Sequence, residues 1–145
     1  TNCSNNYGPF QFPEKLIPVV ILKALHRNEI PVYGTGENIR DWLYVDDHAD
    51  ALLTVLQKGT VGETYNIGTG FGLDNLSVLD SLAVLAQTDG YPVIVKNCPS
   101  RPFDVAANVL SSARLTYVSG WRPATVFEEG LDRTWSWALG AGVGV

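Results

Sequence analysis

Three cations in this chain stand where an anion could bind. Lys15, Arg40 and Arg101 each lie in an expected loop or at an expected strand edge, beside aromatic or proline residues that would hold the side chain. The guanidinium group of arginine presents a planar fork of N–H donors that matches the oxygens of a phosphate. If the three converge, they can bind a diphosphate. The alternative is pairing with local carboxylates, as Lys15–Glu14, Arg40–Asp41 and Arg101–Asp104.

Side-chain amides add polar groups near the first of these cations. Asn5 and Asn6 precede the turn at 7–9, and each amide offers donors and an acceptor to a polar ligand. Asparagine in such a loop also forms Asx turns without any ligand. Asn66 ends an expected strand, where its amide can either contact a ligand or satisfy the backbone.

The motifs that the sequence lacks narrow the function. No G-x-G-x-x-G or G-x-x-G-x-x-G segment is present to bind a dinucleotide pyrophosphate, and no tyrosine is followed four residues later by a lysine. His26 and His48 are isolated, so they form neither a metal site nor a catalytic pair. Cys3 and Cys98 lie far apart and are expected to be reduced. We therefore assign no catalytic residue and no metal ligand.

Short strands that alternate with helices must position these residues. We expect the end of a strand at 1–4, a loop through Pro13, and helices capped by Asp46 and by a Ser77–Asp80 capping box. On the helix after Asp46, the side chains of Leu52, Val55 and Leu56 are expected to face the core. The remaining helices are expected at 16–26, 112–118 and 126–139, and the remaining strands at 31–33, 39–45, 64–67 and 91–96. The four tryptophans, Trp42, Trp121, Trp135 and Trp137, are expected to pack in the core or at its edge.

Composition is that of one α/β domain with a substantial core. The chain has 145 residues, of which 46% are hydrophobic and 17% charged. A net charge of −5 argues against binding to nucleic acid or to an anionic membrane, and no apolar run reaches the length of a membrane span. The absence of a signal peptide favours a cytoplasmic protein. We expect one folded region over residues 1–139 and a frayed glycine-rich tail over 140–145.

Several segments carry a resemblance to a known enzyme family. They read SNNYGPFQFPEKLIP at 4–18, PVYG at 31–34, NIRDWLYVDDH at 38–48 and ETYNIG at 63–68. These segments resemble the dTDP-glucose 4,6-dehydratases, which belong to the extended short-chain dehydrogenase/reductase family of nucleotide-sugar enzymes. The resemblance implies a Rossmann-type enzyme whose N-terminal domain binds NAD, and it identifies this chain with the C-terminal, substrate-binding portion.

The resemblance also implies roles for individual residues. Asn5 would contact the sugar nucleotide and Asn6 the NAD side of the cleft. Arg40 would hold the diphosphate, Asn66 would assist, and Arg101 would close the other side. The substrate would be lined by Lys15, Leu16, Ile17, Pro18, Val19 and Val20, and the nucleoside base would be bordered by Pro31, Val32 and Tyr33.

The match weakens beyond residue 70. The dehydratase pattern Arg-Pro-Gly-His-Asp is replaced by Arg101-Pro-Phe-Asp104, and residues 101–137 look more like the sugar-nucleotide epimerases. A UDP-glucose 4-epimerase-like enzyme and a non-catalytic nucleotide-sugar-binding module therefore stay open as alternatives. In the family, a tyrosine–lysine pair, an acidic pair and NAD carry the chemistry, and these groups would lie upstream of Thr1. We expect the chain alone to be inactive and the parent enzyme to be a homodimer.

Overall fold

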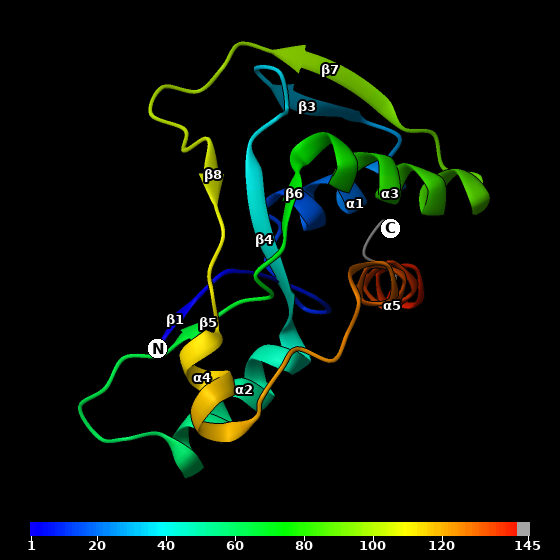
Figure 1. Ribbon diagram of the computed structural model, residues 1–145. Coiled ribbons are helices and arrows are strands. Elements are labelled where there is room, and N and C mark those ends of the chain that lie inside the picture. The colour runs from blue at the N-terminus through cyan, green and yellow to red at the C-terminus, as the bar shows by residue number, and fades with distance from the viewer. Residues whose placement is uncertain (142–145) are drawn as a thin grey trace.

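The computed structural model describes residues 1–141, which fold into a mixed arrangement of helices and short strands (Figure 1). The strands are β1 (Asn2–Cys3), β2 (Asn5–Tyr7), β3 (Glu29–Tyr33), β4 (Ile39–Tyr44), β5 (Asn66–Ile67), β6 (Gly72–Asp74), β7 (Ile94–Cys98) and β8 (Ala107–Asn108). The helices are α1 (Leu16–Leu25), α2 (Val45–Lys58), α3 (Asn75–Thr88), α4 (Ala113–Ser119) and α5 (Phe127–Gly140). The α/β class predicted from the sequence is confirmed.

Strand β4 is the centre of the architecture. Its second half pairs in parallel with β2, and its first half pairs antiparallel with β6 and parallel with β8. Two further parallel pairs lie on either side of it, β3 with β7 and β1 with β5. In Figure 1, β4 runs from the β3–β7 pair above to α2 below. Segments from both halves of the chain therefore meet along one strand.

The side chains of β4 contribute to two hydrophobic clusters, one on each face of the strand. Side chains of successive strand residues point to opposite faces, so Trp42 and Tyr44 join one cluster while Leu43 joins the other. The larger cluster lies among α1, α3 and α5, and the smaller one lies between α2, α4 and β5. Trp121 and Trp135 are buried as predicted, and Trp137 is partly buried against the larger cluster.

Helix α1 has few polar positions because both sides of it are covered. Five of its ten residues are buried, and it packs against α3 and β3. Pro18 falls in the first turn, where its missing N–H has no intrahelical partner in any case.

The predicted cap of α3 is wrong by one turn. The N-cap residue is Asp74, whose carboxylate accepts hydrogen bonds from the backbone N–H of Ser77 at 2.8 Å and from its hydroxyl at 2.8 Å. Ser77 therefore lies inside the helix as a donor to the cap. The two serine donors lower the pKa of the Asp74 carboxyl below its ordinary value.

Helix α2 departs from the prediction at its start and along its face. Its N-cap is Tyr44, so Asp46 lies in the first turn instead of capping it. The predicted inward face is wrong at two of its three positions, because Leu52 is 41% exposed and Leu56 is 82% exposed, whereas Val55 packs against the smaller cluster as predicted. Ala51 and Asp47 are the buried residues of this helix. The aliphatic side of α2 therefore faces outward.

Smaller differences concern boundaries. Strand β7 runs over Ile94–Cys98 where we predicted 91–96, β5 is shorter than predicted, and β2 lies where we predicted a loop. Gly140 is the last residue of α5, which places it outside the predicted tail, and residues 142–145 of that tail lie outside the described residues.

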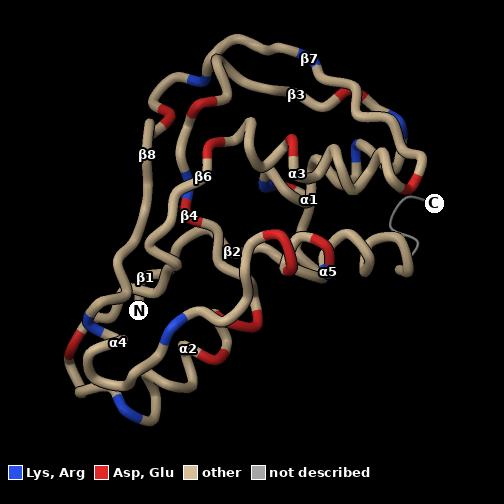
Figure 2. The backbone as a smooth tube through the Cα atoms, turned by 45° about the vertical axis from the view of Figure 1, so that its right-hand side comes forward, with Lys and Arg blue, Asp and Glu red and all other residues tan. Residues whose placement is uncertain are grey.

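Charged residues of both signs are interspersed along the backbone (Figure 2). None of the helices within residues 1–141 combines the length and hydropathy needed to cross a bilayer. Over the same residues, no group of His, Cys, Asp and Glu is arranged to hold a metal ion.

Candidate functional site

The first cation of the site sits at the N-terminus of a helix. Lys15 is the N-cap residue of α1, and no side chain caps the free backbone N–H groups there. The positive end of the helix dipole and the Lys15 ammonium therefore favour an anion at the same end. The predicted ion pair with Glu14 is confirmed at 3.4 Å, and both side chains are more than 60% exposed. Such an exposed pair is weak, so Lys15 is free to exchange its partner.

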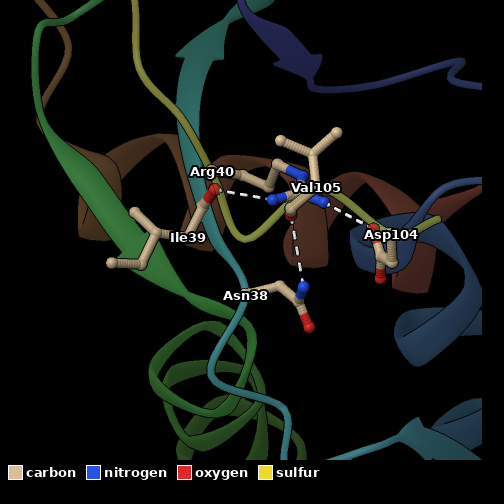
Figure 3. Close-up of polar contacts among 5 residues, drawn as sticks. All are labelled: Asn38, Ile39, Arg40, Asp104 and Val105. Carbon is tan, nitrogen blue, oxygen red and sulfur yellow. Dashed lines mark hydrogen bonds and ion pairs between the residues drawn. The ribbon is translucent and has the colours of Figure 1, made fainter. Parts of the chain in front are cut away.

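The second cation is held by an unexpected carboxylate. Arg40 donates from Nη2 to Asp104 Oδ1 at 2.7 Å and from Nη1 to the carbonyl oxygen of Ile39 at 2.8 Å (Figure 3). The predicted Arg40–Asp41 pair is wrong. Asp41 is 1% exposed and its carboxylate accepts from the backbone N–H groups of Thr69, Gly70 and Leu110 and from the Thr69 hydroxyl.

The third cation stacks on an aromatic ring. The guanidinium carbon of Arg101 lies 3.7 Å from the centroid of the Tyr33 ring. Stacking of this kind holds a guanidinium plane in a fixed orientation. The predicted Arg101–Asp104 pair is wrong, because Asp104 binds Arg40 instead.

Two adjoining hollows bring these cations together. The first, called here the polar cleft, has a volume of about 420 Å³, and the second, the apolar pocket, about 150 Å³. The two share Lys15, Leu16, Asn75, Arg101 and Asp104 as walls. Ser4, Asn5, Asn6, Gln11, Arg40 and Trp42 line the polar cleft alone. Ile30, Pro31, Val32, Tyr33, Val19 and Val20 are among the residues that line the apolar pocket alone.

Four residues that line the polar cleft carry buried side-chain atoms without a hydrogen-bond partner. The side-chain atoms Ser4 Oγ, Asn6 Oδ1, Gln11 Oε1 and Trp42 Nε1 are buried and have no hydrogen-bond partner in the protein. All four residues line the polar cleft. Buried polar groups are nearly always satisfied, so four such atoms on residues around one hollow make this the most polar, least satisfied region beside the three cations.

Three of the predicted site residues lie away from the polar cleft and the apolar pocket. Ile17 is fully buried in the larger hydrophobic cluster, and Pro18 lines neither hollow. Asn66 lies on β5, where its Oδ1 accepts from Asn2 Nδ2 at 3.2 Å. The structure therefore does not bring Ile17, Pro18 or Asn66 to the site, and it does bring the other predicted residues there.

Sequence reasoning missed several walls of the site. Asn75 opens α3 immediately after its cap and lines both hollows. Gln11 donates to the backbone carbonyl of Asn6 at 2.9 Å and so fixes the loop that leads into α1. The cap signal at Asp74 could have placed Asn75 at a helix start, but only the β4–β6 register brings that start beside Arg40.

Perturbed titratable groups lie outside the site. Burial raises the pKa of the Tyr7 hydroxyl far above its usual range, and burial lowers the pKa of the His48 imidazole. Neither residue lines the polar cleft or the apolar pocket. The groups that do line them are cations, amides and carboxylates without a nucleophile and base pair, which suits binding of a polar anion.

Comparison with known proteins agrees with this description. Residues 1–68 match the model of the NAD dependent epimerase/dehydratase family. The dTDP-glucose 4,6-dehydratase of Xanthomonas campestris pv. campestris is 44% identical over 96% of this chain and 42% of its own length. The crystal structure of dTDP-glucose 4,6-dehydratase from Bacillus anthracis in complex with NAD superimposes with a TM-score of 0.87 and 36% identity, over 97% of this chain and 44% of the other. The UDP-glucose 4-epimerase of Thermotoga maritima with UDP-glucose has a TM-score of 0.86 and 32% identity, over 96% and 45%.

The family of the chain follows from these matches. The chain belongs to the NAD dependent epimerase/dehydratase family, as the sequence resemblance predicted. Within it, the chain is similar along nearly its whole length to dTDP-glucose 4,6-dehydratases. It spans about two fifths of the length of the curated relative.

Proposed function

We propose that this chain is the nucleotide-sugar-binding part of an NAD-dependent dTDP-glucose 4,6-dehydratase, a hydro-lyase. Its contribution is to hold the nucleoside diphosphate of dTDP-glucose in the polar cleft and the apolar pocket. The observation that carries the proposal is the meeting of Lys15, Arg40 and Arg101 around four unpartnered buried polar atoms.

The diphosphate belongs in the polar cleft. Arg40 and Arg101 both line it, and the uncapped start of α1 with Lys15 supplies a further positive end. Guanidinium groups and helix N-termini are both favoured partners for phosphate oxygens. Asn5 and Asn75 provide amides for the sugar hydroxyls and the phosphate bridge.

The nucleoside base belongs in the apolar pocket. Pro31, Val32 and Tyr33 form one wall, and Leu16, Val19 and Val20 form part of the remainder. A cavity of about 150 Å³ has room for a single small ring, as an engineered apolar cavity of that size holds benzene. A pyrimidine ring fits within that volume.

Asn6 is the residue that we propose for the cofactor side. Its side chain lines the polar cleft, and its Oδ1 has no hydrogen-bond partner in the protein. Bound NAD would supply hydride transfer, but this sequence has neither a glycine-rich dinucleotide loop nor a Tyr-x-x-x-Lys pair. We therefore propose that the isolated chain binds nucleotide and does not turn over dTDP-glucose. We also propose that the full-length enzyme is a cytoplasmic homodimer that binds neither nucleic acid nor membranes.

The second candidate is the nucleotide-sugar site of a UDP-glucose 4-epimerase. Similarity to the Thermotoga maritima epimerase over 96% of this chain favours it. The two candidates share the diphosphate and differ in the nucleoside. Titrating thymidine diphosphate and uridine diphosphate into the chain by calorimetry separates them, because the tighter nucleotide identifies the substrate class.

The same titration tests the site. We expect Arg40→Ala and Arg101→Ala to weaken thymidine diphosphate binding by about 10- to 100-fold, because each removes a charge-assisted hydrogen bond to phosphate. Arg114→Ala is the matched control. Arg114 pairs with Glu63 and lies outside both hollows, so the affinity should not change. Equal affinities for all four proteins would exclude the polar cleft as the nucleotide site.

A further inference from the structure

The segment 99–109 crosses the site as an exposed strap. Every residue from Pro99 to Val109 is exposed, although the segment connects β7 to the strand pairing of β8. Two of its residues, Arg101 and Asp104, line both the polar cleft and the apolar pocket. A segment with no buried side chain has little packing to fix it, so its position depends on a few polar contacts.

Those contacts are made with the residues that would otherwise receive the ligand. Asp104 binds the Arg40 guanidinium at 2.7 Å, and Arg101 covers the Tyr33 ring at 3.7 Å. Asn38 donates from its side chain to the carbonyl oxygen of Val105 at 3.2 Å, and the backbone N–H of Ile39 donates to the carbonyl oxygen of Ala106 at 2.8 Å. Figure 3 shows the Arg40–Asp104 and Asn38–Val105 contacts side by side at the start of β4.

The Asp104 carboxylate occupies a place where a phosphate oxygen would bind. Both groups are anionic acceptors for the same guanidinium fork. The Arg40 side chain is only 16% exposed, and Nη1 is already engaged with the carbonyl oxygen of Ile39. A phosphate that approaches Arg40 therefore meets a negative charge at short range. Removal of that charge would favour the ligand.

We propose that Asp104 latches the strap over the empty site and competes with the ligand diphosphate for Arg40. Binding of a nucleoside diphosphate moves the Arg40 guanidinium from Asp104 to the phosphate. The released strap then closes over the bound ligand through Arg101. The inference rests on the proposed nucleotide function of this site. It predicts whether the Asp104 carboxylate raises or lowers the affinity for nucleotide. A carboxylate that only positions Arg40 supports affinity, whereas a carboxylate that competes for Arg40 lowers it.

Calorimetric titration of thymidine diphosphate into the full chain measures the direction in which Asp104 changes the affinity. We expect Asp104→Asn and Asp104→Ala to bind it about 2- to 10-fold more tightly than the unchanged protein, in keeping with the strength of a partly exposed ion pair. Glu63→Gln is the matched control, because it removes the carboxylate from the Arg114 pair outside the site and should leave the affinity unchanged. Weaker binding by both Asp104 variants would overturn the proposal and assign Asp104 a positioning role.

A second measurement tests the latch without any ligand. Amide hydrogen exchange of the ligand-free chain should be faster at Ile39 in Asp104→Asn, because that N–H is protected by the strap carbonyl of Ala106. Unchanged exchange there would mean that Asp104 does not hold the strap. If Arg40→Ala loses no nucleotide affinity, the proposed function itself fails; if Arg40→Ala loses affinity and Asp104→Asn does not gain it, only the latch fails.

Discussion

At the scale of single residues, the buried carboxylate of Asp41 holds three separate segments together. It accepts from Thr69 Oγ1 at 2.6 Å, from Thr69 N at 3.0 Å, and from Gly70 N and Leu110 N at 3.2 Å each. The β5–β6 loop and Leu110, which directly follows the strap, are thereby tied to β4 next to Arg40. The sequence places Asp41 beside Arg40, which suggested an ion pair, but its burial depends on segments 28 and 69 residues away.

Replacement of this acceptor should be costly. Asp41→Asn turns a donor toward the backbone N–H groups and leaves at least one of them unsatisfied, so we expect a loss of about 2–3 kcal/mol in the free energy of unfolding. Urea denaturation followed by far-UV circular dichroism measures it. Asp80→Asn, at an exposed position of α3, should change the free energy by less than about 0.5 kcal/mol. Equal losses for the two variants would contradict the role assigned to Asp41.

Gly36 shapes the wall of the apolar pocket. It has φ of 72°, and an added Cβ would lie 2.8 Å from Leu76 Cδ2. Gly62 has φ of 86° with open space around it. A substitution there therefore measures the energetic cost of the backbone conformation without a steric clash. We expect Gly62→Ala to cost about 1 kcal/mol from the left-handed conformation alone, and Gly36→Ala to cost about 2–3 kcal/mol. Thermal unfolding of the two variants compares them, and a larger loss in Gly62→Ala would refute the steric argument.

At the scale of elements, local sequence patterns predicted which segments are helical. They predicted less well the residue at which each helix begins. The apolar runs at 16–26 and 126–139 predicted α1 and α5 within one residue at each end. The start of α3 was wrong because both Asp74 and Ser77 are good capping residues, and the β4–β6 pairing decides between them. The predicted face of α2 was right at Val55 and wrong at 52 and 56, because aliphatic residues at those two positions have the same spacing as a core face. Spacing alone does not tell which surface is covered.

The cap of α3 gives a pH-dependent prediction. Since folding lowers the pKa of the Asp74 carboxyl, its contribution to stability is present at neutral pH and is lost as the pH falls through the lowered value. Asp74→Ala should lower the unfolding temperature at pH 7 by about 3 °C. The difference between the variant and the unchanged protein should shrink at acid pH. Asp80→Ala serves as the control, and a loss in it equal to that of Asp74→Ala would restore the capping box that we predicted.

At the scale of the whole molecule, the site is assembled from segments that are distant in sequence. The residues that line it come from β2 and β4, from the start of α1, from β3, from α3 and from the strap. The cations were recognisable because lysine and arginine in loops are conspicuous. Asn66 was assigned from the resemblance and lies elsewhere, whereas Asn75 lies in the site and had no local signal. The β4–β6 register, which pairs Arg40 with Leu73, brings Asn75 there.

The outward aliphatic side of α2 predicts how the isolated chain behaves in solution. Leu53 is 57% exposed and Leu56 82% exposed, so Leu53→Lys with Leu56→Lys removes apolar surface without opening the core. We expect less light scattering at high protein concentration and a change of less than about 0.5 kcal/mol in unfolding free energy. Val84→Lys on α3, with one side chain 66% exposed, is the control for added charge. Equal improvement by Val84→Lys would show that net charge, and not this surface, governs aggregation.

The arrangement of the tryptophans has a practical consequence. Trp121 donates its indole N–H to Asp50 at 3.0 Å, Trp135 donates to Asp89 at 2.7 Å, and the Trp137 ring packs on Phe10. Trp42 lines the polar cleft, and its indole N–H is buried without a hydrogen-bond partner in the protein. A nucleotide that enters the cleft changes the surroundings of this indole while the other three keep their contacts. The protein therefore contains its own fluorescent reporter of an occupied site, and its emission can be followed without any attached dye.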